Sequence, residues 1–154
     1  PVVAASAHQG IVAATAVEGV GTVAPVQILV AAGAGERIGM RAAEGALDLF
    51  TSEVLLAELA EVLDREHVSR RLESKHRKAS EVLALYEALA KRIVPASIAR
   101  TAPDSDDDAV LACALAAGAD LIISGDKRLR NLKSFHRIPI LSPADALAAI
   151  SLQT

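Results

Sequence analysis

The sequence predicts an α/β fold, a three-layer α/β/α sandwich with a mostly parallel central sheet. Short apolar segments with the length of buried strands alternate with amphipathic segments of helical length, which is the pattern of repeated β–α–β units. The chain has 154 residues, of which 52% are hydrophobic, so it suits a single domain with a sizeable core. No internal repeat and no linker divides it.

The first half of this pattern predicts a strand followed by helices. The stretch LDLFTS predicts a strand that ends near Ser52, whose side chain can cap the helix that begins with EVLLAELAEVL. The segment 68–93 is polar at first and then amphipathic, and IVPAS predicts a strand end that proline terminates. The apolar positions expected to face the core recur at helical spacing; they are Leu55, Leu56, Leu59, Val62, Leu63, Val82, Leu83, Leu85, Tyr86 and Leu89.

The second half predicts two more strands and three helices. A helix from about Asp107 to Ala117 follows an acidic loop and ends at Gly118, a residue suited to a left-handed helix stop. DLIISGD predicts a buried strand, KRLRNL a short helix and IPILSP the last strand. PADALAAI predicts a closing helix with Pro143 near its first turn.

Composition and charge argue against several classes of function. Aromatic residues make up only 2% of the chain, so base stacking is not the main binding device, and a net charge of −3 provides no overall basic field. The single cysteine, Cys113, forms no disulfide framework and favours a reducing compartment. Residues 1–35 contain no Lys or Arg, and no segment reaches transmembrane length. We therefore expect a cytoplasmic protein with no membrane partner.

Two groups of carboxylates are expected to meet at one edge of the sheet. Residues 104–108 place four aspartates in five positions, immediately before an apolar helix. About ten helical residues carry the chain roughly 15 Å away, and a strand of about five residues returns it by a similar distance. Asp126 therefore comes back to the level of Asp108. In open α/β sheets, the carboxyl edge of the strands is where ligands bind.

Glu58 is a third candidate, because it lies at the border of the apolar stripe of its helix, nearer to that stripe than its acidic neighbours. Each acid alone has a simpler structural explanation. Residues 106–108 can cap a helix and favour its dipole, Asp126 can be a turn residue, and Glu58 can be a solvated charge. Four clustered aspartates nevertheless exceed what capping uses, and their mutual repulsion favours a bound cation.

The donor atoms of these acids indicate which cation this is. Oxygen ligands without nearby nitrogen or sulfur select hard cations such as Mg²⁺ or Mn²⁺. The four histidines, at positions 8, 67, 76 and 136, show no paired ligand spacing, which disfavours zinc. An acidic metal site on a small α/β domain suits phosphodiester hydrolysis, because the metal orients a water molecule and neutralises the phosphate.

Three stretches of the sequence closely resemble the PIN-domain family, in particular the VapC-like toxin components of bacterial toxin–antitoxin pairs; they are TSEVLLAELAEVL, DSDDDAVLACALAAGADLIISGDKRL and IPILSPADAL. The similarity makes residues 1–26 a divergent N-terminal segment and residues 27–150 a PIN-like nuclease domain. It implies a Mg²⁺- or Mn²⁺-dependent endoribonuclease with an RNA substrate, a cognate antitoxin and a homodimeric state. Carried over by position, the catalytic and metal-ligating residues are Glu58, Asp108 and Asp126, with Asp104, Asp107 and Ser124 in support.

The sequence departs from the family pattern at the first strand, which in the family ends in Asp-Thr-Asn. Here QILVAAGAG places Gln27 at the Asn position and Pro25 where the first aspartate belongs. Glu18 is the first acid of the chain and no aspartate precedes Asp48. Unless Glu18 compensates, metal binding is weakened. The alternative is a degenerate PIN fold, catalytically weak or inactive, that binds an antitoxin or RNA. A phosphoryl-accepting receiver domain fits poorly, because its acid pair should end the first strand.

Two basic segments are candidates for contacts with phosphates. Lys127, Arg128 and Arg130 directly follow Asp126 and are expected to bind RNA beside the metal. The strongest positive run lies between residues 65 and 78. A solvated helix face explains this run most simply, and a phosphate track or a surface for an acidic partner is the alternative.

Overall fold

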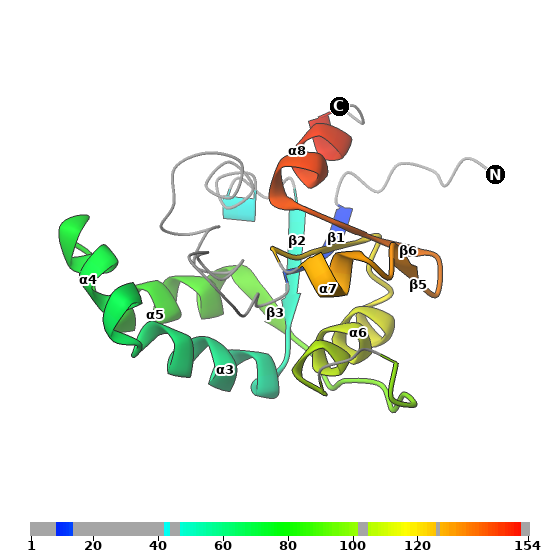
Figure 1. Cartoon of the computed structure of the whole chain (residues 1–154), viewed down its shortest axis with the longest axis horizontal. Coiled ribbons are helices and arrows are strands. Elements are labelled where there is room, and N and C mark those ends of the chain that lie inside the picture. The colour runs from blue at the N-terminus through cyan, green and yellow to red at the C-terminus, as the bar shows by residue number, and fades with distance from the viewer. Residues whose placement is uncertain (1–8, 14–41, 44–46, 102–104, 126, 152–154) are drawn as a thin grey trace.

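The computed structural model describes residues 9–13, 42–43, 47–101, 105–125 and 127–151. Its centre is a six-stranded sheet with the strand order β3-β2-β1-β4-β6-β5 (Figure 1). The strands are β1 (Gln9–Ala13), β2 (Leu47–Thr51), β3 (Ala90–Arg92), β4 (Leu121–Ile123), β5 (Ser134–Phe135) and β6 (Ile138–Leu141).

The strands of this sheet are mostly parallel, as the sequence predicts. β1 pairs in parallel with β2 and β4, β2 with β3, and β4 with β6, whereas β5 and β6 are antiparallel. The carboxyl ends of the parallel strands therefore share one edge of the sheet. The strands β1 and β4 are neighbours, but the chain continues from β1 to β2 on one side and from β4 to β5 and β6 on the other. In open α/β sheets, the binding crevice forms between two such strands, at their carboxyl ends.

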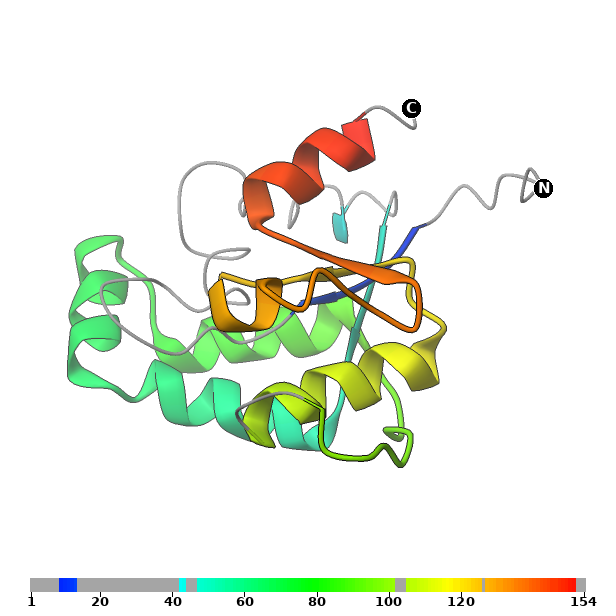
Figure 2. The same cartoon turned by 45° about the vertical axis from the view of Figure 1, so that its right-hand side comes forward.

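Helices connect these strands and pack against the sheet. They are α3 (Glu53–Leu63), α4 (Glu66–Ser74), α5 (Ala79–Leu89), α6 (Ser105–Ala117), α7 (Lys127–Arg130) and α8 (Pro143–Ser151). Figure 2 shows α8 and α6 on opposite sides of the strands. In the described part of the chain, no helix has the length and apolar character needed to cross a membrane.

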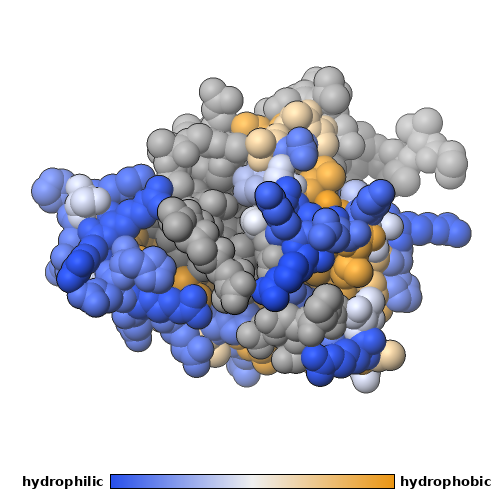
Figure 3. All heavy atoms as spheres, viewed as in Figure 1, coloured by the Kyte–Doolittle hydropathy of each residue, from blue (hydrophilic) through white to orange (hydrophobic). Residues whose placement is uncertain are grey.

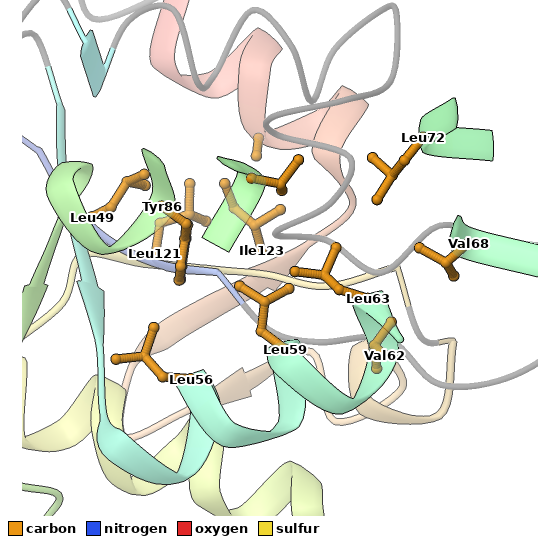
Figure 4. Close-up of a cluster of buried hydrophobic side chains, with 12 residues drawn as sticks. Leu49, Leu56, Leu59, Val62, Leu63, Val68, Leu72, Tyr86, Leu121 and Ile123 are labelled. Carbon is orange, nitrogen blue, oxygen red and sulfur yellow. The ribbon is translucent and has the colours of Figure 1, made fainter. Parts of the chain in front are cut away.

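Two apolar cores lie on opposite faces of the sheet. In the first core, Leu49, Leu121 and Ile123 pack with residues of α3, α4, α5 and α8 (Figure 4). In the second, Ile122 and Ile140 pack with residues of α6 and α7. The chain neighbours Ile122 and Ile123 belong to different cores because successive strand residues point to opposite faces. This arrangement confirms the three-layer α/β/α sandwich.

Local sequence signals fix several of the element boundaries. The Ser52 hydroxyl accepts a hydrogen bond from the Leu55 N–H at 3.4 Å and caps α3, as expected. Helix α6 ends at Ala117, and Gly118 follows with a φ of +59°, a left-handed conformation that glycine adopts without strain. Helix α8 begins at Pro143, where the missing N–H of proline leaves no helical hydrogen bond unmade.

Some elements differ from the sequence-based expectation. Leu85, predicted to face the core, is 40% exposed, because α5 buries only a narrow stripe that includes Val82 and Tyr86. The strand expected to end in IVPAS ends earlier, at Arg92, although the Ile93 N–H still donates to the Thr51 carbonyl at 2.9 Å. The two-residue strand β5 was not predicted, since so short a strand carries no periodic pattern of its own.

The strand β1 is the largest difference from expectation. It lies in the centre of the sheet, between β2 and β4, although it comes from the segment 1–26 that was expected to be divergent and to precede the domain. The assignment of residues 1–26 to a divergent segment and of residues 27–150 to the PIN-like domain stays a prediction. The positions Glu18, Pro25 and Gln27 lie outside the described residues.

Tyr86 is expected to make the fold less stable as the pH rises into the alkaline range. Burial in the core raises the pKa of Tyr86 to about 12, and the Thr51 hydroxyl beside it offsets part of the rise. Below pH 10 the residue is neutral in both states, and its stabilising contribution is complete. As the pH rises from 10 to 12, the unfolded state ionises first, and about 2 kcal/mol of stability is lost.

This pH dependence can be measured directly, because Tyr86 is the only tyrosine of the chain. We expect the tyrosinate absorbance of the folded protein to rise with a midpoint near 12, and that of the urea-unfolded protein with a midpoint near 10. The Tyr86→Phe variant should lose less stability over the same interval. Burial also raises the pKa of Cys113 to about 11, so this variant still loses some stability above pH 9. Equal midpoints in the folded and unfolded protein would contradict the prediction.

Candidate active site

Buried polar side chains gather at the carboxyl edge of the sheet. Thr51 ends β2 and Ser52 follows it, Asp107 lies in the first turn of α6, and Ser124 follows β4. These four side chains are between 0% and 5% exposed, and they make up the buried polar set of the described residues. Burial of polar groups is unfavourable unless they are satisfied, so their concentration at one edge marks this edge as the candidate site.

The aspartates of α6 lie at this edge because α6 runs antiparallel to β4. Asp107 occupies the inner stripe of α6, three and four residues before the buried Val110 and Leu111, and is only 5% exposed. Asp108 is half-buried, and its Oδ1 accepts a hydrogen bond from the Thr101 N–H at 3.1 Å. The sequence favoured Asp108 as the principal acid, whereas the structure buries Asp107 more deeply. The helical spacing of Asp107 from Val110 and Leu111 was the signal for this burial.

Glu58 is half-buried on α3, one helical turn after Leu55. Leu55 belongs to the same apolar core as Val110 and Leu111 of α6. In Figures 1 and 2 the amino-terminal ends of α3 and α6 lie side by side. Because residues three apart share one face of a helix, Glu58 lies on the face of α3 that is turned toward α6.

Ser124 lies where the chain leaves β4 at the same edge. It is fully buried, and its N–H donates to the Leu141 carbonyl of β6 at 2.9 Å, which holds the strand end in place. Asp126, two residues later, lies outside the described residues, as does Asp104. Their predicted part in the site therefore stays a prediction.

The predicted phosphate-binding residues of α7 divide into two kinds. Lys127 and Arg128 are exposed, and Figure 3 shows hydrophilic side chains over α7. Arg130 is half-buried instead, and its guanidinium donates to the Gly125 carbonyl at 3.5 Å. Arg130 thus links α7 to Gly125, the described residue that directly precedes Asp126. Nothing in the sequence indicates this contact, because it depends on how α7 packs against the residues after β4.

The donor chemistry of the edge fits a hard cation. The acids of this region, Asp107 and Asp108 on α6 and Glu58 on α3, offer only carboxylate oxygens, the ligands that Mg²⁺ and Mn²⁺ prefer. Within the described ranges, no group of three or more His, Cys, Asp and Glu side chains is close enough to hold a metal ion. A complete site would therefore need a contribution from residues outside those ranges, such as Asp126.

Comparison with known proteins gives the family. No curated protein and no solved structure shows significant similarity to the chain. A family model described as the PIN domain matches residues 22–128. The match covers α3, the three aspartates of α6, strand β4 and the start of α7, that is, the elements that form the candidate site. The chain therefore belongs to the PIN-domain family.

Proposed function

We propose that this protein is a Mg²⁺- or Mn²⁺-dependent endoribonuclease, the toxin component of a toxin–antitoxin pair. PIN domains are generally nucleases and typically use divalent metals. In our proposal the metal-ligating and catalytic residues are Glu58, Asp108 and Asp126. Asp104, Asp107 and Ser124 support them, and the substrate is RNA.

One observation carries the proposal, the burial of Asp107 directly beside Asp108 at the carboxyl edge. Two neighbouring carboxylates, one of them 5% exposed, repel each other and lose hydration. The positive end of the α6 dipole offsets part of this cost, typically by 0.3–1 kcal/mol per charge at an exposed site. A divalent cation would offset far more, which supports a metal site at this point.

The proposed reaction assigns a separate task to each group of residues. A bound metal would orient the attacking water and neutralise charge on the scissile phosphate. The carboxylates hold the metal at the sheet edge, and Lys127 and Arg128 bind phosphates beside it. The hydrogen bonds of Ser124 and Arg130 hold the described residues on either side of Asp126, which in our proposal contributes a metal-ligating carboxylate.

The partners belong to the same proposal. The family resemblance implies a cognate antitoxin and a homodimer, and the reaction places the protein in the cytoplasm, where its RNA substrate is found. These assignments rest on the family alone.

A catalytically weak or inactive PIN fold that binds an antitoxin or RNA is the second candidate. The composition of β1 favours this second candidate. The strand sequence QGIVA contains no acid, and the next acid after Ala13 is Glu18. The carboxyl end of β1 neighbours that of β4, so an acid missing there removes a potential ligand from the centre of the crevice.

RNA cleavage with controlled metal separates the two candidates. We expect the purified protein to cleave single-stranded RNA in the presence of Mg²⁺ or Mn²⁺, to stop when EDTA is added, and to resume when excess metal is restored. Cleavage that persists in EDTA would contradict the metal-dependent reaction. Binding of RNA without any cleavage in either metal would favour the inactive fold.

A further inference from the structure

The helix α4 and the turn after it carry a dense group of exposed cations. Residues 65–78 contain six of the 16 Lys and Arg residues of the chain and only two acids, Glu66 and Glu73. This segment therefore carries a formal charge of +4 in a protein whose net charge is −3. We call its exposed cations the α4 basic surface; they are Arg65, Arg70, Arg71, Lys75, Arg77 and Lys78.

Two buried side chains anchor the helix that carries the α4 basic surface. Val68 and Leu72 of α4 are 4% and 1% exposed and belong to the first apolar core. They anchor one side of the helix and leave its other side to solvent. Arg70 forms an ion pair with Glu66 one turn earlier, but both side chains are about three-quarters exposed, so the pair contributes little to stability.

Helix stability explains only part of this charge. Cations near a helix C-terminus, such as Arg71 and Lys75, interact favourably with the dipole. Arg65 and Lys78, however, occupy the N-cap positions of α4 and α5 without a side-chain cap of their own, although the Glu81 carboxylate accepts a hydrogen bond from the Lys78 N–H at 3.2 Å. N-caps favour Ser, Thr, Asp and Asn, and a cation at the positive end of a helix is unfavourable. Local rules are most often broken at functional positions, so these cations point to a ligand.

We propose that the α4 basic surface binds the phosphate backbone of an RNA strand outside the cleavage site. This inference rests on the proposed function. Four of the six cations are arginines, whose planar guanidinium group matches phosphate oxygens in two-pronged hydrogen bonds. With aromatic residues at only 2%, contact with bases by stacking is minor, so the binding is electrostatic and independent of sequence.

The position of α4 suits a strand that runs on from the cleavage site. Glu58 and Arg65 are seven residues apart along α3 and the turn after it, about 10 Å at the helical rise, and the nine residues of α4 add about 13 Å. Figure 3 shows hydrophilic side chains over α4 and over α7 on the same face of the molecule. A strand held by Lys127 and Arg128 on one side of the site would be held by the α4 basic surface on the other.

The test is the salt dependence of RNA binding by the full chain in EDTA, where cleavage is stopped. The probe is a fluorescein-labelled oligouridine. For single strands, the slope of log K against log salt is about −0.7 for each phosphate contact. The variant Arg71→Gln/Arg77→Gln/Lys78→Gln should therefore reduce the magnitude of this slope by about 2 and weaken binding at low salt about tenfold or more.

The control variant also removes three positive charges, but from positions outside the α4 basic surface. Lys91, Lys133 and Arg137 are exposed cations along the two outer edges of the sheet, and their replacement by Gln should change the slope by less than one contact. Equal slopes for the two triple variants, or no RNA binding by the unaltered chain, would overturn the proposal. If the α4 triple variant kept both the salt slope and the metal-dependent cleavage of the unaltered chain, the RNA-binding proposal would be overturned and the proposed function would stand. An acidic protein would then be the ligand of the α4 basic surface to examine next.

Discussion

Replacing Asp108 by Asn is expected to lower the rate of RNA cleavage about a hundredfold or more. The asparagine keeps the Oδ1 acceptor for the Thr101 N–H, which is 3.1 Å away, and so preserves the start of α6 while removing the charge. Loss of a group that only supports a metal ligand typically lowers affinity or activity by 10- to 100-fold. Loss of a direct ligand should exceed that range. The measurement is the initial rate of cleavage of single-stranded RNA at saturating Mg²⁺.

The matched control for this variant is Asp120→Asn. Asp120 is an exposed acid just before β4, at the opposite edge of the sheet, so the substitution removes the same charge far from the site. We expect this variant to keep the activity of the unaltered chain. Asp107→Asn tests the supporting role of the more deeply buried Asp107, and its loss of activity should be smaller than that of Asp108→Asn, about 10- to 100-fold. Unchanged activity in both α6 variants would contradict the site.

Leu59→Ala is expected to lower the free energy of unfolding by about 2–5 kcal/mol, a large part of the stability of a domain of this size. Leu59 is 0% exposed and lies in the first core between α3 and the sheet (Figure 4). Its truncation removes apolar contacts and leaves a cavity that the surrounding residues fill only in part. The measurement is the midpoint of urea unfolding at neutral pH.

Val54→Ala in the same helix is the control for this prediction. Val54 is 52% exposed, so its truncation removes little buried area and should change stability by no more than about 0.5 kcal/mol. If Leu59→Ala were as stable as Val54→Ala, α3 would not pack on the sheet as described. Glu58 would then lose the support that places it near α6.

The sequence predicts those parts of the fold that depend on local signals. The cap at Ser52, the stop at Gly118 and the start at Pro143 each follow from a residue whose backbone or side chain favours that position. The strand at 121–123 follows from its apolar run. Counting helical and strand residues predicts the edge of the sheet at which the α6 acids and Asp126 meet, and the site itself stays a prediction because Asp126 lies outside the described residues.

The remaining features depend on contacts between distant segments. The central position of β1 is set by its pairing with β2 and β4, and nothing within QGIVA distinguishes it from other apolar segments. The depth of Asp107 and the contact between Arg130 and the Gly125 carbonyl also arise only when helices pack against strand ends. The individual roles of Glu58 and Asp126 in the site stay predictions.

The central claim is that the carboxylates at the sheet edge bind a divalent metal, and Mn²⁺ calorimetry tests it most directly. We predict saturable Mn²⁺ binding by the unaltered chain and by Asp120→Asn. Binding should be lost or greatly weakened in both Asp108→Asn and Glu58→Gln. The absence of saturable heat in the unaltered chain at millimolar Mn²⁺, or equal binding in all four proteins, would contradict the claim.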